Sequence, residues 1–258
     1  MTNVNKTLYI PLYGKAYVSR RGIILRDKKA ESIWAEVAFP LRGKAKSKWL
    51  AYYMGMRAAV FDRWAAAQTG DIVLHIGCGM DSRAERVGGD RPWYDMDFPE
   101  VIAERRRYYA EDDRYRMAAG DARDPGFLDS IPRGGRATVI MEGISMYLSA
   151  EERKGLLAAL RAHFDQLAIL MDCYTVMAAK MSKYKNPVNT VGVTELHGVD
   201  EPEALCVPGL SFVKEHDMTP RSLIDELQGA EKRIFRRVFA GGFSRKLYRL
   251  FEYRSVNP

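Results

Sequence analysis

The stretch of sequence that decides the fold reads Asp71-Ile72-Val73-Leu74-His75-Ile76-Gly77-Cys78-Gly79-Met80-Asp81-Ser82-Arg83. A short apolar run ends in a pair of glycines, and a helix-compatible segment follows. Glycine permits a tight turn there and, because it has no Cβ, lets a ligand approach the backbone. The pattern predicts a strand, a turn and a helix, the unit of parallel α/β sheets. An ordinary strand-to-helix turn without a ligand is the alternative.

Similar patterns alternate over the rest of the chain. Strands are predicted over residues 71–76, 92–97, 115–119, 137–141, 167–172, 210–216 and 246–253. Helices are predicted over residues 101–109, 149–164 and 220–227. The second helix opens at Ser149, and Glu152 three residues later completes a capping-box pattern. We therefore predict an α/β protein with a Rossmann-like, mostly parallel seven-stranded sheet.

Two regions depart from this alternation. Residues 1–66 contain Tyr-rich and amphipathic helical stretches without a strand-turn-helix unit, so we predict an N-terminal helical cap there. Residues 67–258 form the predicted α/β domain. Within it, residues 182–209 are polar and punctuated by glycine and proline, which indicates a lid-like insertion.

The composition is that of a globular protein. Of 258 residues 47% are hydrophobic and 28% charged, and the formal net charge is +7. Most basic residues are interpreted as solvated surface, including Arg105 to Arg107, which follow Glu104 on a predicted helix. The three cysteines form no disulfide or zinc pattern, so no metal is expected. The sequence has neither a membrane-span pattern nor the apolar core of a signal peptide, which indicates a cytoplasmic protein.

The region around the glycine pair favours a particular class of cofactor. Ser82 stands where a dinucleotide-binding fingerprint has its third glycine, so NAD is disfavoured. Asp97 closes the next predicted strand, where an acid accepts hydrogen bonds from ribose hydroxyls. A nucleoside without phosphate, S-adenosylmethionine (SAM), fits both features. A surface carboxylate before proline is the alternative for Asp97.

Three more positions follow later strands. After the third strand, Asp121 is a candidate acceptor from the adenine amino group, with the Ala122 amide meeting a ring nitrogen. Glu142 closes the fourth strand and is a candidate to face the ammonium group of SAM. A buried Glu142 requires a cationic partner. Tyr147 lies just beyond and is expected to line the methyl-transfer pocket. A loop carboxylate at Asp121 and an exposed acid at Glu142 are the alternatives.

Together these strings resemble the leucine carboxyl methyltransferase family, especially its bacterial branch of tetracenomycin-type polyketide O-methyltransferases. The matching strings, in order over residues 7 to 210, are Thr7-Leu8-Tyr9-Ile10-Pro11-Leu12, Arg57 with Asp62, the segment 76–83, the segment 93–102 and Glu142-Gly143-Ile144-Ser145-Met146-Tyr147-Leu148. The resemblance implies a class I SAM-dependent methyltransferase fold in residues 67–258. One string departs from the branch, where His197-Gly198 stands in place of Trp-Gly.

The resemblance also implies roles for individual residues. Arg57 is expected to grip the cofactor carboxylate, which suits a guanidinium because it binds carboxylates bidentately. The remaining expected cofactor contacts are Gly77, Cys78, Gly79, Asp81, Ser82, Asp97, Asp121, Ala122 and Glu142.

The chemistry of methyl transfer narrows the search for catalytic residues. A carboxylate acceptor needs no general base, whereas a hydroxyl acceptor benefits from one. Among the histidines, His75 is expected to be a core residue and His197 is the one candidate base to test. Tyr147 and His197 are therefore the candidate catalytic residues. Tyrosines expected near an acceptor pocket are Tyr9, Tyr13, Tyr17, Tyr52, Tyr53 and Tyr147. The scarcity of bases favours a carboxyl acceptor or one that ionises by itself.

The leading hypothesis is a SAM-dependent O-methyltransferase acting on a carboxylate or hydroxyl of a small, polyketide-like molecule or on a peptide carboxyl. A nucleic-acid methyltransferase is an alternative raised by the positive charge. It is disfavoured because Glu142-Gly143-Ile144-Ser145 replaces the Asn/Asp-Pro-Pro-Tyr string of amino-methylating enzymes. A catalytically silent SAM-binding partner protein is the second alternative.

Overall fold

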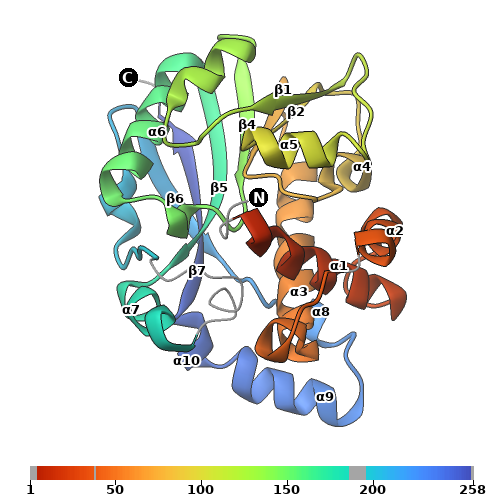
Figure 1. Cartoon of the computed structure of the whole chain (residues 1–258). Helices are drawn as coiled ribbons and strands as arrows, with labels where there is room; N and C mark the ends of the chain where they lie inside the picture. The colour runs from red at the N-terminus through yellow and green to blue at the C-terminus, as the bar shows by residue number, and fades with distance from the viewer. Residues whose placement is uncertain (1–4, 38, 186–195, 257–258) are drawn as a thin grey trace.

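The computed structural model describes residues 5–37, 39–185 and 196–256 (Figure 1). Its centre is a seven-stranded sheet in the order β3-β2-β1-β4-β5-β7-β6. The strands are β1 (Ile72–Ile76), β2 (Trp93–Asp97), β3 (Tyr115–Ala119), β4 (Arg136–Met141), β5 (Gln166–Tyr174), β6 (Leu210–His216) and β7 (Tyr248–Ser255). Neighbours from β3 to β5 pair in parallel, and β7 runs antiparallel to both β5 and β6. The predicted mostly parallel seven-stranded sheet is confirmed.

Helices cover both faces of this sheet (Figure 1). The α-helices of the described residues are α1 (Tyr9–Arg20), α2 (Lys28–Val37), α3 (Lys48–Ala66), α4 (Arg83–Val87), α5 (Pro99–Arg105), α6 (Ala150–His163), α7 (Val176–Lys185), α8 (Arg221–Ile224), α9 (Gly229–Ile234) and α10 (Gly242–Arg245). The predicted capping box at the start of α6 is present, because Ser149 accepts from the Glu152 amide and Glu152 accepts from the Ser149 amide.

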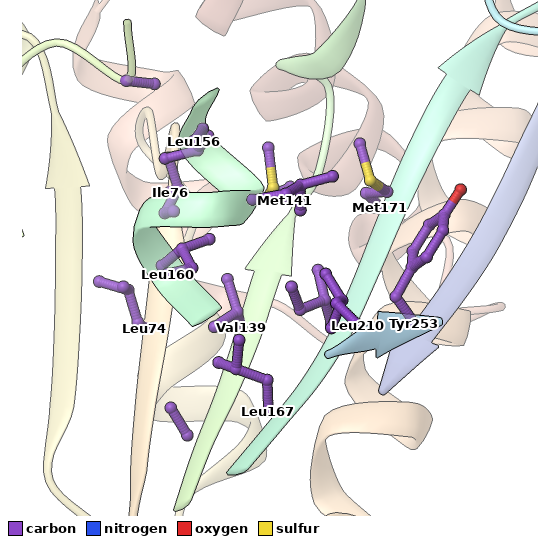
Figure 2. Close-up of a cluster of buried hydrophobic side chains, with 14 of the residues drawn as sticks. Leu74, Ile76, Val139, Met141, Leu156, Leu160, Leu167, Met171, Leu210 and Tyr253 are labelled. Atoms are coloured by element: carbon purple, nitrogen blue, oxygen red, sulfur yellow. The ribbon is translucent and has the colours of Figure 1, made fainter. Parts of the chain in front are cut away.

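The alternation of side chains along the strands divides the core into two layers. On one face Leu74, Val139 and Met171 pack against Leu156 and other residues of α6 (Figure 2). On the other face the intervening strand residues pack against α3, as Val73, Ile140 and Leu170 do with Met56 and Phe61. Successive side chains of a strand point to opposite faces, so buried parallel strands are apolar on both sides.

Most of the described residues predicted to form a helical cap are helical, chiefly in α1, α2 and α3. The longest of these helices, α3, packs directly on the sheet, as the preceding cluster shows. The N-terminal helical region therefore shares a hydrophobic core with the α/β sheet through α3. The division at residue 66 into two domains stays a prediction.

Several boundaries differ from those predicted. The helix after β2 begins at Pro99, because proline suits the first helical turn. It ends at Arg105. β5 extends to Tyr174, which pairs with Tyr248 of β7. The segment from Gly229 to Arg245 is largely helical, although no helix was predicted there.

The predicted insertion over residues 182–209 begins inside α7. Residues 186–195 of it lie outside the described residues. Gly198 returns to the sheet edge, where it bridges to Tyr174. Within the described ranges, no helix has both the length and the apolarity needed to cross a membrane.

Candidate active site

A cavity of about 440 Å³ lies where β1, β2 and β4 end, between the sheet and helices α1, α3 and α7. A cavity of this size suits a small-molecule ligand. Eight predicted site residues line it, namely Arg57, Gly77, Cys78, Gly79, Asp81, Asp97, Glu142 and Tyr147. Four others are not among its lining residues, namely Ser82, Asp121, Ala122 and His197. Most of the expected positions therefore meet in one place, because the carboxyl ends of parallel strands share one edge of the sheet.

The glycine loop is held in an unusual backbone conformation against the end of β2. Gly77 has φ of +74° and Gly79 has φ of +50°, values that side-chain-bearing residues rarely adopt. A Cβ on Gly77 would also lie 2.9 Å from Cδ1 of Ile144. The amides of Gly77 and Cys78 donate to the carbonyl of Met96, at 2.8 and 3.1 Å. The loop therefore presents bare backbone to the cavity.

Asp97 organises the same loop. One carboxylate oxygen accepts from the amide of Gly79 at 2.7 Å, and the other accepts from the amide of Phe98 at 2.8 Å. Burial raises the pKa of Asp97 although these amides oppose the shift. A carboxylate has about four lone-pair sites. The two amides use two of these sites, so two lone-pair sites of Asp97 remain for a ligand in the cavity.

Glu142 has the cationic partners that its burial requires. Arg57 lies 3.0 Å from one of its oxygens, and Arg83 contacts the other. Burial alone would raise the pKa of Glu142, but Arg83 and Arg57 hold it at about 2. Arg57 also pairs with Asp172 of β5 at 2.9 Å. The carboxylate at the end of β4 is thus ionised and fixed in place.

Asp81 and Ser82 connect the loop to its surroundings. Asp81 lies 2.9 Å from Lys15 and 2.7 Å from Arg86. The Ser82 hydroxyl donates to the buried carboxylate of Asp27 at 2.6 Å. The contacts of Ser82 face α2 rather than the cavity. A direct role of either residue in cofactor binding stays a prediction.

Asp121 and Ala122 follow β3, one strand further from the cavity. The Asp121 carboxylate accepts from the Arg123 guanidinium at 2.5 to 2.9 Å. Arg123 in turn lies 5.9 Å from the ring centre of Phe98, which lines the cavity. Ala122 is buried in the core under α6. Neither Asp121 nor Ala122 lines the cavity, and their adenine contacts stay a prediction.

The two candidate catalytic residues occupy different places. The Tyr147 side chain lines the cavity, and burial raises the pKa of its phenol. The His197 amide donates to the carbonyl of Met146 at 2.8 Å, but the residue does not line the cavity. His75 lies at the cavity wall, and its nitrogens are 3.2 Å from Asp95 and from Arg83. The prediction of His75 as a core residue is confirmed by its exposure of 1%.

Arg105 corrects one sequence interpretation. We predicted it to be a surface residue, but it is fully buried. Its guanidinium pairs with the buried carboxylate of Asp95 and donates to the carbonyls of Gly79 and Asp81, at 2.9 and 2.7 Å. The prediction was wrong because helix α5 turns this position toward the glycine loop, a tertiary contact that local charge pattern does not encode.

The far half of the cavity is aromatic and apolar. Its residues come from α3, α7, β5, β7 and the loops beside them, and include Tyr53, Met54, Met146, Tyr147, Tyr174, Met181, Phe239 and Tyr248. Of the six tyrosines expected near an acceptor, Tyr53 and Tyr147 line the cavity. Tyr174 and Tyr248 were missed, because both stand at strand ends that only the β5–β7 pairing defines. Along α3, Leu50, Tyr53, Met54 and Arg57 share one helical face.

Comparison with known proteins agrees with this geometry. No family model matches the chain. Tetracenomycin polyketide synthesis O-methyltransferase TcmP of Streptomyces glaucescens is 30% identical over 246 residues, which cover 90% of this chain and 89% of that protein.

Solved structures share the fold at low sequence identity. A putative methyltransferase from Thermobifida fusca has a TM-score of 0.54 at 14% identity and covers 95% of this chain and 94% of its own. Magnesium protoporphyrin IX methyltransferase from Synechocystis, solved with bound SAM, has a TM-score of 0.52 at 11% identity and covers 88% of this chain and 91% of its own. The chain is a SAM-dependent methyltransferase, and it belongs to the family of tetracenomycin-type O-methyltransferases.

Proposed function

We propose that this enzyme methylates an oxygen of a small aromatic molecule of the polyketide type, with the acceptor seated in the aromatic half of the cavity. The observation that carries this proposal is that one cavity is lined both by charged residues and by a group of tyrosines, to which we assign the cofactor and the acceptor. Asp97, Glu142 and Arg57 mark the polar half at the strand ends, and Tyr53, Tyr174 and Tyr248 mark the aromatic half. The relative that synthesises tetracenomycin polyketides supports the same acceptor class.

The residues of the polar half fit SAM. The carboxylate of Asp97 suits the ribose hydroxyls, and the bare backbone of Gly77 and Gly79 leaves room for the nucleoside. Glu142 suits the ammonium group. Within the described part of the chain, the buried Nε of Arg57 has no hydrogen-bond partner, which leaves a donor for the cofactor carboxylate. Bound SAM supplies a methyl group activated by its sulfonium, and the protein aligns the acceptor and excludes water.

The proposal is tested by the products formed from methyl-labelled SAM. The acceptors are 1-naphthol, 1-naphthoic acid, 1-hydroxy-2-naphthoic acid and a short peptide with a free C-terminal carboxyl. We expect labelled product from at least one naphthalene, identified by mass and by whether base releases the label from an ester. Transfer to the peptide alone would contradict the proposal and favour a peptide carboxyl acceptor.

Replacing Asp97 by alanine is expected to weaken binding of S-adenosylhomocysteine (SAH), the demethylated product, by about tenfold or more. The change removes the ribose acceptor and also frees the Gly79 amide. Isothermal titration calorimetry measures the affinity. Asp112→Ala is a matched control, because Asp112 is an exposed carboxylate that also caps backbone amides, those of Arg114 and Tyr115. Equal SAH affinities for both variants would contradict the assignment of Asp97.

A further inference from the structure

Tyr248 stands between the acceptor half of the cavity and a carboxylate that the cavity does not reach. It is the first residue of β7, and its ring lies edge-on to Tyr174 at 4.8 Å and stacked with Tyr53 at 6.2 Å. Its hydroxyl donates to Oδ2 of Asp172 at 2.5 Å and accepts from the Arg57 guanidinium at 2.6 Å. A phenol oxygen has a second acceptor position. Among the described residues Arg57 is the one donor to this oxygen, so the second position has no protein donor, and Tyr248 lines the cavity.

Asp172 is a buried carboxylate that accepts hydrogen bonds from three groups. It is fully buried and is not among the residues that line the cavity. Its Oδ1 accepts from the amide of Gly143 at 2.7 Å, and its Oδ2 accepts from both Arg57 and Tyr248. Burial raises the pKa of Asp172, although Arg57 opposes the shift. Three cavity-lining residues contact this carboxylate, and Tyr248 is the one that can both give up and accept a proton, because Arg57 stays charged and Gly143 donates a backbone amide.

Three other groups at the cavity wall, those of His75, Glu142 and Tyr147, are poorly suited to accept a proton, and Asp97 is assigned to the ribose. The nitrogens of His75 contact Asp95 and Arg83. Glu142 is held ionised, with a pKa of about 2, by two guanidinium groups. Tyr147 has a raised pKa, so its phenolate form is scarce near neutral pH. A hydroxyl acceptor still needs its proton removed, because a neutral hydroxyl is a poor nucleophile.

We propose that Tyr248 and Asp172 form a proton relay that serves as the general base for hydroxyl acceptors. The inference rests on the proposed O-methylation of a small aromatic acceptor. The acceptor proton passes to Oη of Tyr248 while the Tyr248 proton passes to Oδ2 of Asp172. The acceptor oxygen bonds to the transferred methyl carbon as the carbon–sulfur bond breaks, and its electron pair stays with sulfur. The Asp172 carboxyl returns the proton through Tyr248 to solvent after product release.

The relay gives hydroxyl and carboxyl acceptors different requirements. A carboxylate is already ionised and does not use the relay, so Tyr248 affects ether formation far more than ester formation. Arg57 keeps Tyr248 and Asp172 in contact and offsets the charge of Asp172. Other titratable groups that interact with Asp172 or lie around Tyr248 include Tyr53, Glu142, Tyr147, Cys173, Tyr174, Glu215, His216, Asp217 and Arg245.

The test compares Tyr248→Phe with wild-type enzyme on 1-naphthol and 1-naphthoic acid. We expect Tyr248→Phe to lower kcat for ether formation by about 100-fold, a factor at least about tenfold larger than its effect on kcat for ester formation. SAH affinity by calorimetry is expected to stay within about twofold. Tyr253→Phe is the matched control, because it removes another buried hydroxyl from β7, bonded to the Pro202 carbonyl and outside the cavity.

The pH profile separates the relay from a packing role. Asp172 must be ionised, so wild-type ether formation falls as pH drops through the Asp172 pKa and is level above it. In Tyr248→Phe the rate rises with pH instead, because the naphthol must ionise in solution. The relay would be overturned if wild type and Tyr248→Phe had parallel pH profiles for ether formation. It would also be overturned if Tyr248→Phe lost ether and ester formation equally. Wild-type enzyme that forms only esters overturns the relay alone, whereas no transfer to either naphthalene overturns the acceptor class as well.

Discussion

Replacing Arg105 by alanine is expected to lower the free energy of unfolding by about 3–5 kcal/mol, because it leaves a buried carboxylate without its cation. Asp95 is fully buried, and burial by itself would raise its pKa. The charge of Arg105 outweighs this effect and holds the Asp95 pKa at about 2. The substitution also removes the donors to the carbonyls of Gly79 and Asp81. Urea unfolding followed by circular dichroism measures the loss. A weakened SAH affinity is expected as well, because Arg105 supports the glycine loop.

Arg106→Ala is the matched control. The two arginines are adjacent, and both substitutions remove one positive charge. The Arg106 side chain is 52% exposed and lies 3.6 Å from Glu111, so its loss is expected to change the free energy of unfolding by about 0.5 kcal/mol or less. Similar destabilisation by both substitutions would contradict the structural role of Arg105. Arg105→Lys, which keeps the charge but loses the planar fork, is expected to lie between the two.

Replacing Arg57 by alanine is expected to weaken SAH binding by about 100-fold and to destabilise the protein by about 3–5 kcal/mol. Arg57 is 4% exposed and lies between Glu142 and Asp172, which would be left as neighbouring buried acids. Its absence also removes the proposed contact to the cofactor carboxylate. Calorimetric titration with SAH measures the first effect and urea unfolding the second.

Arg63→Ala is the control for this variant. Arg63 lies on the same helix, is exposed and contacts the hydroxyl of Ser222 at 3.4 Å. We expect its SAH affinity and stability to remain close to wild type. If Arg57→Ala bound SAH with wild-type affinity while folded, the proposed cofactor role of Arg57 would be wrong and its role would be structural.

The local sequence was sufficient for elements whose signals lie within a few residues. β1 and its glycine loop follow from an apolar run and two glycines, and both glycines have positive φ in the structure. Helix α6 follows from its capping box. The acids Asp97 and Glu142 were expected at the cavity because parallel strands end at one edge of the sheet. The helical segment from Gly229 to Arg245 was missed, because its pieces are short and interrupted by a π-helical turn at Phe235–Phe239.

By itself the sequence determined the α/β class, the strand order in the chain, the family and the polar half of the cavity, since these depend on periodicity, turn chemistry and strand ends. Only the tertiary structure decided which charges are buried and which tyrosines meet. Arg105 turned inward, and Tyr248 reached Asp172 through the antiparallel pairing of β7 with β5. These contacts join residues distant in the chain. Their energies depend on burial and on partners that no local pattern specifies.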